Sequence, residues 1–257
     1  ARGEATKILQ AARIYSMHTE ELKYTLSHMS AQQINGLDRM YNHVFKYKTD
    51  GFFVELGVGE CKGKASNTAD LADLGWKGIY VEPHPSHYDE CVDRHKDNDV
   101  SCFQCCAGNC HDELELHGDT TFKNVFEAFD KLGWYPPPGD KPGTLMPPVS
   151  VPQRPVNEIL EEGNCPKNYD LFSIDVEGAE YTILGIYDFN LYRPKLVIIE
   201  TRHRDPHFIN NFPDMVENSI KSVNILQENE YREVYADYTN SIFIDKNNDT
   251  INGAIFR

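Results

Sequence analysis

A glycine-containing turn and a later carboxylate are arranged as in proteins that bind adenosine cofactors. The turn, Glu55-Leu56-Gly57-Val58-Gly59, closes an apolar run that begins at Phe52. This is the pattern of the first strand-to-helix turn of an open α/β sheet, where nucleotide-like ligands bind. Glycine leaves the backbone bare, so that a ligand can lie against it. Glu82, followed by Pro83, ends the next predicted strand, and a carboxylate there can accept both ribose hydroxyls.

The acidic residues around this turn favour S-adenosylmethionine over a dinucleotide. A dinucleotide site uses G-x-G-x-x-G, so that the helix N-terminus can meet the pyrophosphate. Here Lys62 stands at the third glycine position and Gly63 comes one residue later. Glu55 and Glu60 would repel a pyrophosphate, whereas they suit the amino group and the sulfonium of S-adenosylmethionine. The sequence therefore predicts methyl transfer, with a nicotinamide-dependent oxidoreductase as the alternative.

Four cysteines and a histidine are crowded into one short stretch, namely Cys102, Cys105, Cys106, Cys110 and His111. Thiolate and imidazole ligands at short spacing suit tetrahedral zinc. The favoured interpretation is instead a buried strand over Val100 to Cys106, on which neighbouring side chains face opposite ways and cannot all reach one ion. No second C-x-x-C pair completes a set of four ligands.

Alternating strands and helices must position these residues, and they predict an α/β fold with a mostly parallel sheet and helices on both faces. The expected strands are Phe52–Leu56, Ile79–Glu82, Val100–Cys106, Leu171–Asp175 and Leu196–Ile199. The expected helices are Ser66–Leu74, Ser86–Arg94, Val156–Glu161, Ala179–Leu184 and a long helix around residues 216–226. Tyr231–Tyr235 and Ser241–Ile244 are close enough in sequence to form a C-terminal antiparallel hairpin.

Two segments flank or interrupt this alternation. Residues 1–50 are predicted to be a helical extension of a domain covering 51–257, since one apolar stripe at helical spacing runs through Leu37, Met40, Tyr41, Val44 and Phe45. At about 118–148 we expect an insertion with a further helix and a proline-rich segment containing Trp134 and Tyr135. This insertion is interpreted either as a semi-rigid lid or substrate wall, or as a structural loop without a ligand.

Composition excludes two classes of partner. The net charge of −15 would repel a phosphate backbone, so we expect no nucleic acid partner. The longest apolar runs fall far short of the roughly 20 residues that a membrane span needs. Seven cysteines, an odd number, favour reduced thiols and a cytoplasmic protein. The chain begins at Ala1 and not at methionine, which is interpreted as a processed terminus or a piece of a longer polypeptide.

Several motifs in order resemble the FkbM family of methyltransferases. They are Gly51-Phe52-Phe53-Val54-Glu55-Leu56-Gly57, Ser66-Asn67-Thr68, Gly75-Trp76-Lys77-Gly78, Glu82-Pro83-His84-Pro85 and Ser173-Ile174-Asp175-Val176-Glu177-Gly178-Ala179-Glu180. The resemblance runs from about residue 32 to 244, and the insertion at 118–148 is its least familiar part. It implies a class I, Rossmann-like fold that uses S-adenosylmethionine, with O-methylation of sugar or polyketide hydroxyls as the usual reaction.

The resemblance also implies roles for individual cofactor residues. It places Glu55, Gly57 and Gly59 at the methionine end of the cofactor, and it adds Ser66, Asn67 and Thr68, at the start of the next helix, as further cofactor contacts. Glu82 with Pro83 is placed at the ribose, and Cys106 and Ala107 at the adenine. Asp175 is placed where the methyl group emerges. The alternative role for residues 66–68 is helix capping, since Ser, Asn and Thr are favoured N-cap residues.

Acidic residues at two further strand ends are the candidates for activating the acceptor. A sugar hydroxyl is a poor nucleophile and needs a base, a metal ion or both. Similarity to sugar O-methyltransferases that bind a metal at these two strand ends implies Mg²⁺ or Mn²⁺ on Asp175 and Glu200, although Thr201 stands where a third acid would follow. Without a metal, Asp175, Glu177 or His203 is expected to serve as the base.

These observations predict an S-adenosylmethionine-dependent O-methyltransferase acting on a sugar, a nucleotide sugar or an oligosaccharide. Besides the oxidoreductase, a non-catalytic domain of a larger glycan-building protein is the other alternative. The oligomeric state does not follow from the sequence.

Overall fold

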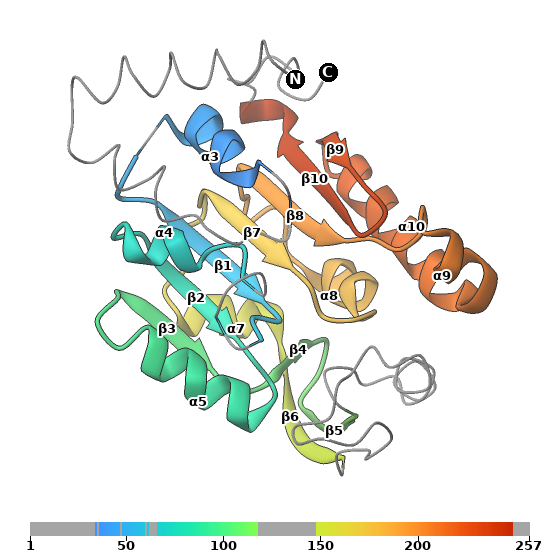
Figure 1. The fold of residues 1–257 in the computed structure, drawn as a ribbon, viewed down its shortest axis with the longest axis horizontal. Helices are drawn as coiled ribbons and strands as arrows, with labels where there is room; N and C mark the ends of the chain where they lie inside the picture. The colour runs from blue at the N-terminus through green and yellow to red at the C-terminus, as the bar shows by residue number, and fades with distance from the viewer. Residues whose placement is uncertain are drawn as a thin grey trace.

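The computed structural model describes residues 34, 36–46, 48–59, 61, 66–117 and 148–248, and in them a seven-stranded sheet forms the centre (Figure 1). The strand order is β3-β2-β1-β7-β8-β10-β9. Strands β3, β2, β1, β7 and β8 are parallel, while β10 runs antiparallel to both β8 and β9. Their bounds are β1 Phe52–Leu56, β2 Lys77–Val81, β3 Val100–Phe103, β7 Leu171–Ile174, β8 Leu196–Glu200, β9 Tyr231–Ala236 and β10 Asn240–Asp245.

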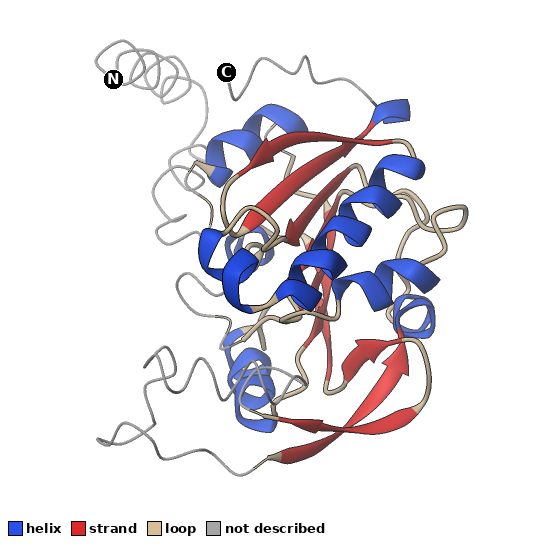
Figure 2. Cartoon of the chain, turned by 90° about the vertical axis from the view of Figure 1, so that its right-hand side faces the viewer, coloured by secondary structure: helices blue, strands red, loops and turns tan. Residues whose placement is uncertain are grey.

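Helices cover both faces of this sheet because its strands are apolar on both sides (Figures 1 and 2). In β1, Phe53 packs on one face, while Val54 and Leu56 pack on the other. The face of Phe53 is covered by α3 (Leu37–Phe45), α4 (Ala69–Asp73) and α5 (Pro85–Arg94). The opposite face is covered by α7 (Val156–Glu162), α8 (Glu180–Ile186) and α10 (Pro213–Glu228). The prediction of a mostly parallel sheet with helices on both faces and a C-terminal antiparallel hairpin is confirmed.

Proline sets the start of three helices. α5, α10 and the short α9 (Pro206–Asn211) each begin with proline in the first turn, where its missing N–H costs no helical hydrogen bond. α9 is also capped by Asp205, whose side chain accepts a hydrogen bond from the backbone N–H of His207 at 2.8 Å. A single 3-10 turn, η1 (Lys246–Asn248), ends the described chain.

The predicted strand from Val100 to Cys106 is wrong in its extent and burial. β3 ends at Phe103 and pairs with β2 alone, so it is an edge strand with no fully buried residue. Cys106 belongs to a second sheet with the order β4-β6-β5, which the sequence analysis did not anticipate (Figure 2). This smaller sheet consists of β4 (Cys106–Gly108), β6 (Val149–Pro155) and β5 (Asp112–Leu116).

Part of the predicted N-terminal extension packs within the main core. Leu37, Met40, Tyr41 and Phe45 of α3 are buried against the sheet with Trp76. The rest of the predicted extension and almost all of the insertion at 118–148, including its helix, Trp134 and Tyr135, lie outside the described residues. Among the helices that are described, none has the length and apolarity to cross a bilayer.

Candidate active site

A cavity of about 410 Å³ opens where the carboxyl ends of β1, β2 and β7 meet the smaller sheet. Its size falls within the range of small-molecule sites, and this edge is where open parallel sheets bind their ligands. Eight residues that the sequence analysis singled out line it: Gly57, Gly59, Glu82, Pro83, Cys106, Ala107, Asp175 and Glu177. The structure therefore brings together residues from four separate segments of the chain.

The glycine turn lies against the backbone of β7. Gly57 has a left-handed backbone with φ of 77°, and a Cβ placed on it would lie 1.7 Å from the carbonyl oxygen of Asp175. Its own N–H donates to the carbonyl oxygen of Val81 at 2.9 Å. Gly59 is left-handed too, with φ of 57°. A side chain at Gly57 would both strain the backbone and close the floor of the cavity.

Glu82 ties this turn to the end of β2. Its Oε2 accepts from the N–H of Gly59 at 2.8 Å, and its Oε1 accepts from the N–H of His84 at 2.9 Å. The Nδ1 atom of His87 lies 3.9 Å from the same Oε1. The Glu82 side chain is buried, holds the loop through these two N–H groups and lines the cavity.

Glu55 and residues 66–68 lie beneath the cavity and are not among its lining residues. The Glu55 carboxylate is 1% exposed and accepts from Ser66 Oγ at 2.7 Å, Asn67 N at 2.7 Å and Thr68 Oγ1 at 2.6 Å. Burial raises the pKa of Glu55, and these hydrogen bonds oppose the rise. Direct cofactor contact, predicted for all four residues, stays a prediction. In the described geometry they form a hydrogen-bonded group next to the turn.

Ser66 also holds the turn that precedes the next helix, although the N-cap residue of that helix is Thr68, whose side chain makes no capping hydrogen bond. Ser66 Oγ accepts from the N–H groups of Thr68 at 3.2 Å and Ala69 at 3.0 Å while its own hydroxyl donates to Glu55. The predicted helix over Ser66–Leu74 is accordingly shorter, and α4 covers only Ala69–Asp73.

The smaller sheet supplies an apolar wall that the sequence analysis only partly identified. Cys106 and Ala107 were predicted to line the site, and they do so. Leu114, Leu116 and Gln153 line it as well but were missed. The signal for the two leucines was present, because Asp112 to Leu116 alternates acidic and apolar residues in the manner of a half-buried strand.

An acidic cluster occupies the opposite side, at the ends of β7 and β8. Asp175, Glu177 and Glu200 each offer a carboxylate oxygen within 4.8 Å of the others. Glu177 has a left-handed backbone with φ of 52°, followed by Gly178 at 110°. Burial, together with the charges of Asp175 and Glu177, raises the pKa of Glu200 well above its ordinary range. Three such carboxylates suit a hard divalent cation or a shared proton.

Arg202 provides a cation beside this cluster. Its guanidinium forms an ion pair with Glu200, and both side chains are largely withdrawn from solvent. Glu180 supports the turn from below, since its Oε1 accepts from the N–H groups of Val176 at 3.0 Å and Gly178 at 3.3 Å. Burial raises the pKa of Glu180 to about 7.

The structure does not bring His203 to the cavity, although it was predicted as a possible base. His203 lies in the turn after β8, is partly buried and is not among the lining residues. Burial, followed by the charge of Arg204, lowers its pKa. Arg204 itself is held by Glu233 through two contacts of 3.0 and 2.9 Å.

The zinc site considered for residues 102–111 does not form among the described residues. Of these cysteines, Cys105 and Cys106 line the cavity, whereas Cys110 is exposed and contacts Gln153. His111 pairs with Glu158 at 2.8 Å. Glu60 and residues 62–65 of the glycine turn lie outside the described residues.

Comparison with known proteins identifies a family. The family model described as "Methyltransferase FkbM domain" matches residues 57–233, which is more than half of the chain. No protein of curated function matches.

Solved structures with a similar arrangement share little sequence with this chain. The methyltransferase FkbM of Methylobacillus flagellatus KT is 14% identical with a TM-score of 0.46, over 76% of this chain and 44% of its own. An O-methyltransferase of Bacillus cereus in complex with SAH is 10% identical with a TM-score of 0.44, over 93% and 89%. The fibrillarin pre-rRNA processing protein of Methanococcus jannaschii is 15% identical with a TM-score of 0.42, over 77% and 68%. The chain thus spans less than half of the length of the first of these.

Proposed function

Because the chain belongs to the FkbM family of methyltransferases and has their class I fold, we propose that it transfers the methyl group of S-adenosylmethionine to a hydroxyl of a sugar, a nucleotide sugar or an oligosaccharide. One observation carries this proposal. A single cavity has a ribose-type acceptor, Glu82, on one wall and the acids Asp175 and Glu177 on another.

The residues of the cavity fit S-adenosylmethionine. Glu82 would accept the ribose hydroxyls, and the backbone of Gly57 and Gly59 would face the methionine end. Cys106 and Ala107, with the leucines of β5, would form the apolar wall for adenine. The acidic side of the cavity suits the positive charge of the cofactor, whose sulfonium supplies an activated methyl group.

Asp175 and Glu177 are the proposed groups for activating the acceptor. A hydroxyl at this wall would give its proton to one of these carboxylates as it attacks, which general base catalysis requires of a weak nucleophile. Glu200 sits deeper, paired with Arg202, and its raised pKa favours a protonated or neutralised state. We therefore assign the base to Asp175 or Glu177, with rate gained mainly by positioning.

The same cluster fits a divalent metal ion. Three carboxylates within reach of one another match the oxygen ligands of Mg²⁺ or Mn²⁺. A third acidic ligand could have followed Glu200, but the sequence has Thr201 there. We propose Glu177 as the third ligand instead. Asp175, Glu177 and Glu200 would hold the ion, which would lower the pKa of a bound hydroxyl, and Arg202 would then have to release Glu200.

Neither alternative from the sequence has an observation in its favour. Against an oxidoreductase, the chain lacks the third glycine of a dinucleotide-binding turn, and the matching family model describes methyltransferases. A non-catalytic domain has little reason to gather three buried or half-buried carboxylates at the edge of a cavity.

A labelled-methyl screen tests the proposal. The full chain is incubated with methyl-labelled S-adenosylmethionine, Mg²⁺ or Mn²⁺, and a panel of nucleotide sugars and short oligosaccharides. We expect label on a carbohydrate oxygen, and we expect Asp175→Asn to lose this transfer while still binding S-adenosylhomocysteine. Transfer to a nitrogen or carbon acceptor, or equal transfer by both Asp175→Asn and Glu177→Gln, would contradict the proposal.

A further inference from the structure

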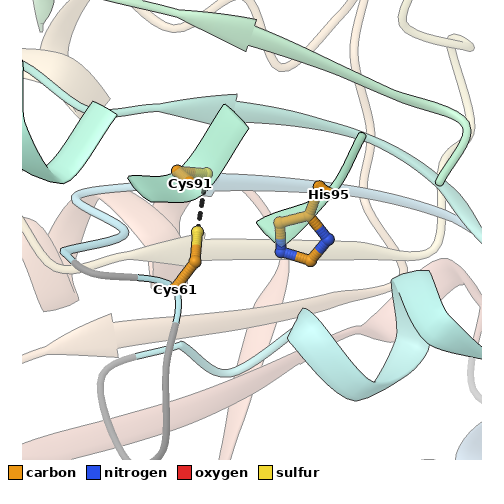
Figure 3. A group of neighbouring side chains, drawn as sticks. All are labelled: Cys61, Cys91 and His95. Atoms are coloured by element: carbon orange, nitrogen blue, oxygen red, sulfur yellow. Dashed lines mark hydrogen bonds between the residues drawn. The ribbon is translucent and has the colours of Figure 1, made fainter. Parts of the chain in front are cut away.

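A second group of metal-ligating side chains lies in the core between the glycine turn and α5 (Figure 3). Cys61 comes two residues after Gly59, while Cys91 and His95 are four residues apart and face the same way at the end of α5. One ligand atom of each lies within 4.8 Å of the others. All three side chains are buried, with at most 2% exposure, so their proximity is not a surface coincidence.

His95 is oriented as a metal ligand would be. Its Nδ1 lies 3.0 Å from Oδ1 of Asn98, an acceptor that selects the tautomer with the proton on Nδ1. Its ring packs on that of Tyr80 at 4.6 Å between centroids, which fixes the plane of the imidazole. The Nε2 atom therefore carries a lone pair, and among the described residues it has no hydrogen-bond partner although it is buried. A buried polar atom in this state is rare and indicates a missing partner.

The three residues supply two sulfurs and one imidazole nitrogen, which are the donor types of a tetrahedral zinc site. Cys102 of β3 neighbours Cys91 but is not a member of this group.

We propose that Cys61, Cys91 and His95 supply three ligands of one structural Zn²⁺ ion. Soft thiolate and imidazole donors in a closed, buried set select zinc over Mg²⁺ or Mn²⁺. Each cysteine ligand gives up its thiol proton on binding, so the ion replaces protons and no electron is transferred. The site would tie the segment after Gly59 to α5.

Zinc explains more of the cluster than a disulfide does. The sulfurs of Cys61 and Cys91 are 2.6 Å apart, and a disulfide would join only these two atoms. It would leave Nε2 of His95 without a partner. Two thiolates on one tetrahedral zinc lie about 3.7 Å apart, with Zn–S bonds near 2.3 Å, so binding requires the pair to open by about 1 Å. Cys61 is in a loop rather than in a helix or strand, where such a shift is easiest.

The metal content of the full chain tests this site. The protein is purified without chelator, and zinc is measured by mass spectrometry of the metal after exhaustive dialysis. We expect one zinc per chain in the unmodified protein and in the control Cys165→Ser, whose thiol is buried apart from the cluster. Cys91→Ser and His95→Gln should each lose most of the metal. Zinc retained by both variants would overturn the assignment.

Spectroscopy of the unmodified protein avoids dependence on variants that fail to fold. Replacement of zinc by Co²⁺ should produce a thiolate-to-metal charge-transfer band, which binding at the carboxylates of Asp175, Glu177 and Glu200 cannot produce. X-ray absorption at the zinc edge should give sulfur neighbours near 2.3 Å and nitrogen near 2.0 Å. A spectrum with oxygen ligands alone, a chain that binds neither metal, or a Cys61–Cys91 disulfide shown by alkylation and intact mass would each refute the site.

Discussion

The carbonyl oxygen of Asp175 lies against Gly57 so closely that a Cβ atom on Gly57 would be 1.7 Å away from it. This contact joins the end of β1 to the end of β7. The glycine turn and the acidic side of the cavity are therefore held together by backbone, and only glycine permits this approach.

Replacement of Gly57 by alanine should damage both folding and cofactor binding. The left-handed backbone alone costs about 1–2 kcal/mol for a residue with a Cβ, and the clash adds to that. We expect the melting temperature of Gly57→Ala to fall by roughly 5 °C or more in thermal denaturation, with loss of S-adenosylhomocysteine binding. Gly185→Ala is the matched control, because a Cβ there meets nothing within 4 Å. Equal stability of the two variants would refute this role of Gly57.

Glu82→Gln should weaken cofactor binding more than folding. The amide keeps one acceptor oxygen for Gly59 or His84 but loses the charge and an acceptor. Since a hydrogen bond to a charged group contributes about 1.5–3 kcal/mol, the Kd for S-adenosylhomocysteine should rise by about ten- to a hundredfold in calorimetry. The exposed Glu161→Gln should leave the Kd unchanged. An unchanged Kd in Glu82→Gln, with a normal melting temperature, would remove Glu82 from the ribose position.

Glu180 should make the folded protein less stable as pH rises. Its pKa is about 7 in the folded protein, above the ordinary value of 4.5, so the folded state holds this proton where the unfolded chain has released it. The stabilisation is complete below pH 4.5 and is lost as pH rises through about 7, by no more than about 3.4 kcal/mol. Glu200 acts in the same direction.

Urea denaturation between pH 5 and 8 in metal-free buffer measures this effect. Glu180→Gln keeps an acceptor for the N–H groups of Val176 and Gly178 without a titrating proton. Its free energy of unfolding should fall less steeply with pH than that of the unmodified protein. Parallel slopes for the two proteins would show that Glu180 titrates normally.

Manganese binding should depend on Glu177. The unmodified protein is titrated with Mn²⁺ and the free ion is followed by electron paramagnetic resonance. Because Glu177 completes a set of three carboxylates, Glu177→Gln should weaken binding by at least about tenfold. Glu161→Gln again serves as the control. If the unmodified protein leaves millimolar Mn²⁺ free, the metal part of the proposed function is wrong and the carboxylates act without it.

The central sheet could be predicted from the sequence because its strands are short apolar runs that alternate with helices. Phe52–Leu56 and Leu196–Glu200 are buried on both faces, which produces continuous apolar stretches. The smaller sheet was not predicted. β6 lies between β4 and β5 yet contains Pro152 and Pro155, and proline argues against a central strand.

The sequence predicted that the site lies at the ends of the strands. It did not show which residues line the cavity and which lie behind the lining. Glu55 has the spacing of a cofactor ligand, yet it accepts three hydrogen bonds from residues 66–68 and does not line the cavity. Sequence spacing cannot tell a side chain that faces the cavity from one that faces the turn beneath it. His203 follows the correct strand but does not line the cavity, since its position depends on the loop after β8. The approach of Cys61 to Cys91 and His95 also required the fold, because 30 residues separate the two cysteines.

Calorimetric titration of the unmodified protein with S-adenosylhomocysteine, and separately with NAD, tests the central claim most directly. If the cavity between Glu82 and Asp175 is a methyl-donor site, S-adenosylhomocysteine should bind with a stoichiometry of one and at least about tenfold more tightly than NAD. Tighter binding of NAD, or no binding of S-adenosylhomocysteine by a folded protein, would contradict it.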